Sequence, residues 1–311
     1  MSKFVIGVDV GGTNIKLGLV NQSGKVTSRT SFSTRAYLHN KPKLIQVLIR
    51  EISLLLKRTH IPVRNVQGIG IGLPGLINPQ KGVVIFLPNI PGWRNVPLQR
   101  IIESKFGIRT FLENDVNLIT LGEWKFGAGK GSKNLICLTL GTGVGGGLVL
   151  NNELYRGEGF VAGEIGHLPL NEEGPVCGCG GYGCFECYIG NRYVLKEASR
   201  LFKRKSIDFP DIRRLTRAGH PNAKLFWRQM AVHIGNGLTG IVNILNPTLV
   251  IIGGGVSHHN YQYLSQTLRM TVKKRAMKVQ AAMAKIVKAR LGDDAGIIGA
   301  RVLVNQQEKK R

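Results

Sequence analysis

Two glycine-rich turns, each between two apolar strands, constrain the fold of this chain more than any other feature. Residues 4–20 read FVIGVDVGGTNIKLGLV and residues 135–150 read LICLTLGTGVGGGLVL, so a strand, a glycine turn and a second strand occur twice. Glycines in such a turn let backbone N–H groups approach an anion closely. The repeat predicts two lobes with a cleft between them, in which the two turns could hold a polyphosphate from both sides.

The first turn, DVGGTNIK at residues 9–16, carries several groups that suit a phosphate. Gly11 and Gly12 let the backbone N–H groups approach a phosphate closely, and Thr13 adds a hydroxyl donor. Asp9, just before the turn, could hold Mg²⁺ through water, because that ion keeps much of its hydration shell. The alternative is an ordinary glycine hairpin that Asp9 caps, and this motif alone does not decide between the two.

The second turn, LGTGVGGG at 140–147, has five glycines in seven positions. A hairpin needs fewer, since each glycine costs backbone entropy on folding. The pattern is not a Walker loop, which has a Lys after its last glycine, nor a dinucleotide fingerprint, which opens a helix. The occurrence of two such turns favours phosphate binding for both.

A candidate base lies in the segment LENDVN at 112–117, where a predicted strand ends in Asn114 and Asp115. A carboxylate at a strand end beside a cleft is suited to take a proton from a hydroxyl. The competing role for Asp115 is a helix N-cap, because the apolar-periodic stretch VNLITLGEW follows it. Spacing alone favours the cap, and both roles are compatible.

Four of the five cysteines lie within eleven residues, which predicts a metal site. His167, Cys177, Cys179 and Cys184 have the spacing H-x₉-C-x-C-x₄-C, and one imidazole with three thiolates makes the closed tetrahedral set of a structural zinc. Cys187 offers a rival set of four cysteines that would leave the histidine free. Four free thiols without metal are the third alternative.

Polar side chains around the cysteines and upstream of them suit a sugar. Glu164, His167 and Glu186 lie within or beside the cysteine segment, and Asn89 lies upstream in FLPNIPGW. Carboxylates and amides can accept hydrogen bonds from sugar hydroxyls. Singly, each is more typical of an ordinary surface residue, and the neighbouring metal loop favours a binding role.

Periodicity predicts the remaining organisation. Apolar residues at helical spacing indicate a helix at 42–57, helical pattern dominates 191–245, and the tail from 296 is a helix that could fold back. A loop-rich insertion spans 157–190. No low-complexity linker separates the halves, so both lobes belong to one α/β fold.

The net charge of +25 is the unusual feature of the composition. Its basic blocks at 203–205, 273–275 and 309–311 are short, lie in helical pattern and carry no zinc-finger or RNA-binding signature. We therefore expect a solvated basic surface and no specific nucleic-acid site. ATP is an anion, so the charge is compatible with ATP binding without identifying it.

The sequence gives no sign of membrane association. It has no run of 18 apolar residues, and its first residues, MSKFVIGVDV, lack the features of a signal peptide. We expect a cytoplasmic protein.

Taken together, these motifs resemble the ROK family of bacterial sugar kinases, repressors and open-reading-frame proteins, within the actin-like ATPase superfamily. The resemblance covers essentially the whole chain. It rests on eight segments in the family's order, which are DVGGTNIK, LPG at 73–75, PNIPGW at 88–93, ENDVN at 113–117, LGTGVGGG, GEIGH at 163–167, CGCGGYGCFE at 177–186 and IIGGG at 251–255.

The resemblance implies a role for each matching residue. Asp115 would be the catalytic base that takes the proton of the sugar's primary hydroxyl. The implied sugar ligands are Asn89, Asn114, Glu164, His167 and Glu186. The implied cofactor-binding residues, for ATP and Mg²⁺, are Asp9, Gly11, Gly12, Thr13, Lys16, Gly141, Thr142, Gly143, Gly254 and Gly255. The implied zinc ligands are His167, Cys177, Cys179 and Cys184, so His167 would bind zinc through one ring nitrogen and sugar through the other.

The same resemblance implies a two-lobed actin-like ATPase fold, related to ribonuclease H, with mixed sheets flanked by helices and a zinc-binding loop insertion. We expect a small lobe at 1–115, on which the helix 296–311 packs back, and a large lobe at 116–295. Relatives of this kind are dimers or tetramers, so a homo-oligomer is expected. Two features depart from the family pattern: Cys187 and the strong basicity.

Three functions remain as alternatives. PNIPGW and ENDVN are most similar to glucokinases, so an ATP-dependent kinase acting on the 6-hydroxyl of glucose comes first. N-acetylglucosamine or N-acetylmannosamine kinases share the sugar motifs and come second. A sugar-responsive repressor comes third, because such proteins carry a helix-turn-helix domain before the kinase-like part, and here the first strand begins at residue 4.

Overall fold

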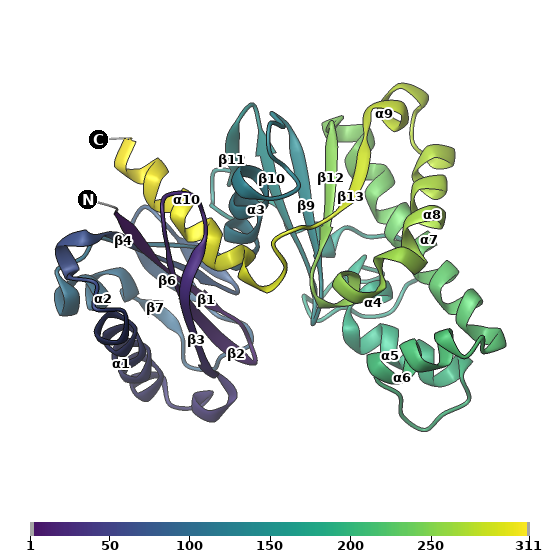
Figure 1. The fold of residues 1–311 in the computed structure, drawn as a ribbon. Helices are drawn as coiled ribbons and strands as arrows, with labels where there is room; N and C mark the ends of the chain where they lie inside the picture. The colour runs from purple at the N-terminus through teal and green to yellow at the C-terminus, as the bar shows by residue number, and fades with distance from the viewer. Residues whose placement is uncertain (1–2, 310–311) are drawn as a thin grey trace.

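Two five-stranded sheets occupy opposite halves of the molecule in the computed structural model, which describes residues 3–309 (Figure 1). The first sheet has the order β3-β2-β1-β4-β8 and contains β1 (Phe4–Val10), β2 (Asn14–Val20), β3 (Val26–Ser33), β4 (Val66–Leu73) and β8 (Thr110–Asn114). The second has the order β11-β10-β9-β12-β13 and contains β9 (Leu135–Leu140), β10 (Val144–Leu150), β11 (Glu153–Tyr155), β12 (Leu249–Gly253) and β13 (Lys285–Lys288).

The two sheets share one topology. In each, the strands of a glycine hairpin pair antiparallel, as β1 does with β2 and β9 with β10. A third strand then runs parallel to the first strand of that hairpin, as β4 does beside β1 and β12 beside β9. The internal repeat that the glycine turns predicted therefore extends to whole sheets, and the mixed two-lobed α/β fold is confirmed.

The helices of the first half cover the first sheet. They are α1 (Lys41–Thr59) and α2 (Leu98–Phe106). The side chain of Asn40 caps α1 by accepting a hydrogen bond from Lys43 N at 3.0 Å, and the helix ends where His60 adopts a left-handed conformation. The apolar face predicted for this helix is the face that is buried: Leu44, Val47, Leu48, Ile52 and Leu55.

A second set of helices packs on the outer face of the second sheet (Figure 1). They are α4 (Glu186–Ile189), α5 (Asn191–Leu201), α6 (Phe209–Arg217), α7 (Pro221–Leu245), α8 (Gly255–Arg275) and α9 (Lys278–Met283). The helical pattern predicted for 191–245 is confirmed. Helix α8 was predicted only at its end, in the basic block 273–275, because polar Ser257 and Asn260 interrupt its buried face. Ser257 Oγ donates a hydrogen bond to Gly253 O at 2.6 Å, and Asn260 Nδ2 donates one to Val256 O at 2.7 Å.

Two helices lie between the sheets, α3 (Asp115–Phe126) and α10 (Ala295–Lys309) (Figure 1). Their backbones touch, because a Cβ on Gly122 or Gly299 would overlap a carbonyl oxygen of the other helix. Helix α10 also packs on the first sheet, where a Cβ on Gly70 would lie 2.7 Å from the Cβ of Ala300. Residues 310 and 311 of the predicted C-terminal helix lie outside the described residues.

A small sheet was also missed by the sequence analysis. It joins β5 (Leu76–Asn78), β6 (Val83–Phe86) and β7 (Arg94–Val96), strands of only three or four residues. Strands this short show no readable alternation of apolar and polar residues.

Among residues 3–309, no helix combines the length and apolar character that crossing a membrane requires. The lobe boundary between residues 115 and 116 and the homo-oligomer stay predictions.

Candidate functional site

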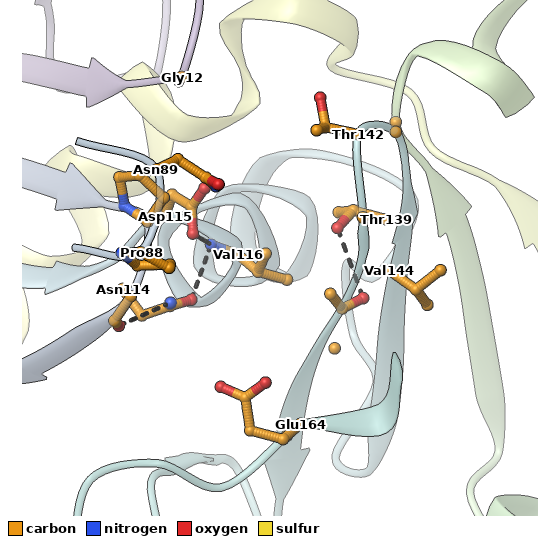
Figure 2. A pocket seen from close by; sticks show the side chains of 18 of the residues that line it. Gly12, Pro88, Asn89, Asn114, Asp115, Val116, Thr139, Thr142, Val144 and Glu164 are labelled. Atoms are coloured by element: carbon orange, nitrogen blue, oxygen red, sulfur yellow. Dashed lines mark hydrogen bonds between the residues drawn. The ribbon is translucent and has the colours of Figure 1, made fainter. Parts of the chain in front are cut away.

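The two glycine turns meet at a cavity of about 540 Å³ between the sheets. Figure 2 shows its two sides, with Asn89 and Asp115 on one side and Thr139, Thr142 and Val144 on the other. Thirteen of the predicted site residues line it: Gly11, Gly12, Thr13, Asn89, Asn114, Asp115, Gly141, Thr142, Gly143, Glu164, His167, Glu186 and Gly254. Segments separated by more than 200 residues thus converge on one space.

Both turns border this cavity, and each is closed by a hydrogen bond of its own backbone. The amide of Gly11 donates to Asn14 O at 3.0 Å, and that of Gly141 donates to Gly143 O at 3.0 Å. Gly254 has a φ of 86°, and a Cβ there would overlap the backbone of Leu140. The strand end at Gly254 therefore packs directly behind the second turn.

Asp115 is the first residue of α3, and the helix cap is its neighbour. Asn114 Oδ1 accepts hydrogen bonds from Val116 N at 2.9 Å and Asn117 N at 3.2 Å, which makes Asn114 the N-cap. The prediction of Asp115 as the cap is therefore wrong. Asp115 Oδ1 also accepts a hydrogen bond from Val116 N, at 2.9 Å, and the Asp115 side chain borders the cavity.

The surroundings of Asp115 suit a base. Burial, supplemented by the negative charge of Asp9, raises the pKa of Asp115 to about 7. Burial also raises the pKa of Asp9 to about 6, although the ammonium of Lys16 opposes this shift. A carboxyl group that loses its proton near neutral pH can both accept a proton and return it.

Glu186 connects the cysteine segment to the second glycine turn. Its Oε2 accepts a hydrogen bond from Val144 N at 2.9 Å. A Cβ on Gly143 would overlap that same carboxylate oxygen, so a side chain at this position would displace it from the Val144 amide. On the opposite wall of the cavity, Asn114 Nδ2 donates to Gly75 O at 3.4 Å.

The two ring nitrogens of His167 face different partners. Nδ1 lies 3.6 Å from Cys177 Sγ, and Nε2 lies 3.9 Å from Glu164 Oε2. Both His167 and Glu164 line the cavity. One edge of the imidazole thus faces the cysteines and the other faces the polar side chains of the site.

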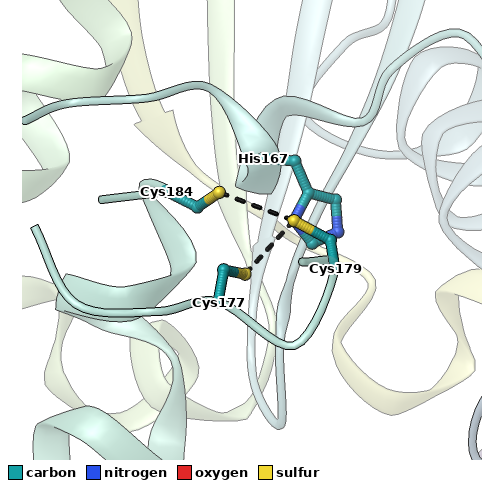
Figure 3. A group of neighbouring side chains, drawn as sticks. All are labelled: His167, Cys177, Cys179 and Cys184. Carbon is teal, nitrogen blue, oxygen red and sulfur yellow. Dashed lines mark hydrogen bonds between the residues drawn. The ribbon is translucent and has the colours of Figure 1, made fainter. Parts of the chain in front are cut away.

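The predicted zinc ligands converge in space (Figure 3). The candidate ligand atoms of His167, Cys177, Cys179 and Cys184 all lie within 4.8 Å of one another. A tetrahedral zinc with bonds of about 2.3 Å to sulfur and about 2.05 Å to nitrogen separates two sulfurs by about 3.8 Å and sulfur from nitrogen by about 3.6 Å. The observed Cys179–Cys184 separation is 3.7 Å and the Cys177–His167 separation is 3.6 Å, so these residues fit zinc.

Cys187 packs against Cys177 and Cys184 but does not complete the ligand set. Its Sγ lies 3.9 Å from the carbonyl oxygen of Val176, to which it can donate, and it is not among the four residues whose ligand atoms converge. The geometry therefore favours the set that contains His167 over the set of four cysteines.

Three predicted cofactor residues lie elsewhere. Asp9, Lys16 and Gly255 line a neighbouring cavity of about 230 Å³, which shares Gly254 with the first. Lys16 Nζ is 3.1 Å from the exposed carboxylate of Asp293. Asp9 and Lys16 are paired across β1 and β2, directly before and after the turn, and their assignment to ATP and Mg²⁺ stays a prediction.

The sequence analysis missed several lining residues. Arg35, Pro74, Phe160 and Val161 border the first cavity, and His258 borders the second. Pro74 belongs to the LPG segment at 73–75 but was assigned no role, and the other four lie in no pattern that indicates chemistry. Phe160 and Val161 fall within the predicted insertion at 157–190, and its loop-rich composition was the one sequence feature that could have indicated them.

Comparison with known proteins agrees with this architecture. The sequence matches the ROK family over residues 5–307. The chain belongs to the ROK family. Its fold is accordingly the actin-like ATPase fold that the motifs implied.

Relatives within the ROK family include enzymes and regulators. The glucokinase of Streptomyces coelicolor is 33% identical over 320 residues, covering 97% of this chain and 98% of the relative. The xylose repressor of Caldicellulosiruptor bescii is 31% identical, covering 96% of this chain and 77% of the relative.

Solved ROK structures superpose over nearly the whole chain. The glucokinase of Streptomyces griseus, in complex with glucose and AMPPNP, gives a TM-score of 0.84 at 31% identity and covers 97% of this chain and 99% of that one. A putative N-acetylmannosamine kinase from Listeria monocytogenes gives 0.81 at 26% identity and covers 98% and 99%.

Proposed function

We propose that this ROK protein is an ATP-dependent sugar kinase that phosphorylates the 6-hydroxyl of glucose. The observation that carries the proposal is the position of Asp115, a carboxyl group with a pKa of about 7 in a cavity bordered by both glycine turns. The similarity of this chain to glucokinases, over almost the full length of both chains, supports the same conclusion.

In this proposal the triphosphate binds between the turns at Gly11–Thr13 and Gly141–Gly143. The backbone and hydroxyl groups of these turns hydrogen-bond the phosphate oxygens. The smaller cavity behind Gly254 would take the rest of the nucleotide. Asp9 would hold Mg²⁺ through water, and the ion would neutralise charge on the phosphates.

The chemical step then requires one proton transfer. The Asp115 carboxylate accepts the proton of the sugar hydroxyl as its oxygen attacks the γ-phosphorus, and ADP leaves in line with the attack. Positioning and electrostatic stabilisation supply most of the rate, because phosphoryl transfer needs little covalent participation by the protein. Water excluded from the cavity can no longer compete as acceptor.

The sugar would be held by Asn89, Asn114, Glu164, His167 and Glu186, which border the same cavity. Zinc held by Cys177, Cys179, Cys184 and His167 Nδ1 would fix the imidazole, so that Nε2 can bind a sugar hydroxyl. The metal thereby has a structural role at the sugar end of the site.

Glucose is preferred over an N-acetyl sugar because PNIPGW and ENDVN are most similar to glucokinases. N-acetylglucosamine and N-acetylmannosamine are the alternatives, and the Listeria relative supports them. A coupled ADP-release assay across the three sugars tests the choice. Turnover on an N-acetyl sugar without turnover on glucose would exclude the glucose assignment.

A sugar-sensing regulator is the second candidate, favoured by the relatedness to xylose repressors and by the net charge of +25. Filter binding with specific and random DNA at rising salt tests it. We expect weak retention that salt abolishes for both DNAs, because phosphate attraction carries no sequence information. Salt-resistant, sequence-selective retention would instead support a regulator.

We also propose that the protein works in the cytoplasm, where the thiols of its five free cysteines stay reduced and available to metal.

A further inference from the structure

A buried ion pair joins the two sides of the sugar site. Arg156 Nε donates to Glu113 Oε2 at 2.7 Å, and the two side chains are 19% and 2% exposed. Among ion pairs of residues 3–309, no other has both partners so deeply buried. Glu113 belongs to β8 of the first sheet, whereas Arg156 follows β11 of the second.

Glu113 also organises the corner that carries Asp115. Its Oε1 accepts hydrogen bonds from Asn114 N at 3.0 Å and from Asn117 Nδ2 at 3.0 Å. These two asparagines flank Asp115, and both line the cavity. The bond to Asn117 fixes its amide orientation, since only the nitrogen can donate to a carboxylate.

Arg156 is tied to the opposite side of the site through its backbone. Its carbonyl oxygen accepts a hydrogen bond from Ala162 N at 2.9 Å, which closes the loop 157–164 on itself. That loop carries Glu164, which lies across the open space from Asn114 and Asp115 in Figure 2. The guanidinium of Arg156 is thus anchored at the base of the loop that presents Glu164 to the cavity.

We propose that Glu113 and Arg156 are positioning residues that set the separation between the Asn114–Asp115 corner and the Glu164 loop, and thereby tune sugar affinity. This inference rests on the proposed sugar-kinase function. A buried ion pair is a poor stabiliser compared with apolar side chains of similar volume, because both charges lose their hydration. The Glu113–Arg156 pair can instead hold two segments at a set separation. These segments are the Asn114–Asp115 corner and the Glu164 loop, and both border the cavity.

The test uses the full-length protein with single and paired substitutions. Glu113→Gln keeps the shape of the side chain and removes its charge, Arg156→Met removes the guanidinium, and Arg156→Lys keeps the positive charge. The control is Glu308→Gln, which removes the charge that pairs with Arg109, and neither residue lines either cavity. For each protein, kcat, the KM values for sugar and for ATP, the sugar Kd by calorimetry and the melting temperature are measured.

We expect Glu113→Gln and Arg156→Met each to raise the sugar KM and Kd about tenfold or more, because a small displacement of groups around a reacting hydroxyl has large effects. The ATP KM stays within about twofold of the native value, since the hydrogen bonds of neither side chain reach the glycine turns. Arg156→Lys restores part of the affinity, and the double variant is no worse than the worse single variant because both changes break one interaction. The control changes neither KM.

Several results would overturn the inference. These are an unchanged sugar KM and Kd in a folded variant, a parallel rise in both KM values, or additive losses in the double variant. If Glu113→Gln does not fold, Arg156→Lys and Arg156→Met decide by the same criteria. If the native protein phosphorylates no sugar, the proposed function is wrong. If the native protein is active and the variants have an unchanged sugar KM and Kd, only the positioning role is wrong.

Discussion

The carboxylate of Glu186 accepts a hydrogen bond from the amide of Val144 at 2.9 Å, and this contact ties the cysteine segment to the second glycine turn. Glu186 opens α4 two residues after the metal-ligand candidate Cys184. Val144 begins β10, directly after the turn proposed to bind phosphate. One hydrogen bond thus connects the segment expected to bind sugar with the segment expected to bind ATP.

Gly143→Ala should raise the sugar KM about tenfold or more, because its Cβ would displace the Glu186 carboxylate from the Val144 amide and break a charge-assisted hydrogen bond. Steady-state kinetics with varied sugar measures the effect. Gly141→Ala is the matched comparison, since a Cβ there meets open space and the sugar KM should stay near the native value. Equal sugar KM values for the two variants would refute the steric argument.

Asp115→Asn should lower kcat by about 10²- to 10⁴-fold, the usual contribution of a general base. Sugar affinity should change little, because the amide retains the shape of the side chain. Rapid-quench turnover and calorimetric titration with sugar measure the two quantities separately. Near-native turnover in this variant would show that another group removes the proton.

The pH profile should report the environment of Asp115. Because the base works only when ionised and its pKa is about 7, kcat/KM for sugar should fall as pH drops below about 7. Asp9→Asn removes a negative charge that contributes to this shift, so it should move the acidic limb to lower pH. Burial is the larger cause, so the limb should stay well above the ordinary range of a carboxyl group. A limb that does not move would contradict the coupling between the two carboxyl groups.

Cys179→Ser should lose bound zinc and raise the sugar KM, because the released metal no longer holds His167. Cys187→Ser is the matched control and should keep its zinc, since its thiol points to the Val176 carbonyl. Metal analysis of both purified variants measures their zinc content, and steady-state kinetics measures their sugar KM. Full zinc content after replacement of His167 would instead favour the set of four cysteines.

The parts of the fold predicted from the sequence were those encoded locally. The glycine turns lie between apolar strands, and the periodicity of α1 marks its buried face without reference to the rest of the chain. The spacing of His167 and the cysteines limited the zinc ligands to two sets. Only the structure distinguishes these sets, by bringing the imidazole close to Cys177 across an intervening loop.

The parts that the sequence did not predict depend on tertiary contacts. Asn114 and Asp115 are both good N-cap residues, and the path of β8 decides between them. The Glu113–Arg156 pair joins residues 43 positions apart, and no local pattern indicates such a contact. Asp9 and Lys16 are separated from the turn's cavity because their strands carry them to the neighbouring one.

Asp115→Asn should also stabilise the protein at alkaline pH. The folded-state pKa of about 7 lies above the ordinary value of 3.8, so the folded protein binds this proton more tightly than the unfolded chain does. The free energy of unfolding therefore decreases as pH rises from 3.8 to 7, and at pH 8 the native protein carries the full cost of a buried charge. The rise of the Asp115 pKa from 3.8 to about 7 corresponds to at most about 4 kcal/mol in the free energy of unfolding.

Urea denaturation at pH 5 and pH 8 measures this effect. The gain in free energy of unfolding from Asp115→Asn should be larger at pH 8, because the native carboxyl group is still mostly protonated at pH 5. Glu172→Gln, at an exposed position outside both cavities, controls for the loss of one acidic group and should give no such difference. If Asp115→Asn changes the stability equally at both pH values, the carboxyl group is not held at an elevated pKa, and its assignment as a base tuned to neutral pH fails with it.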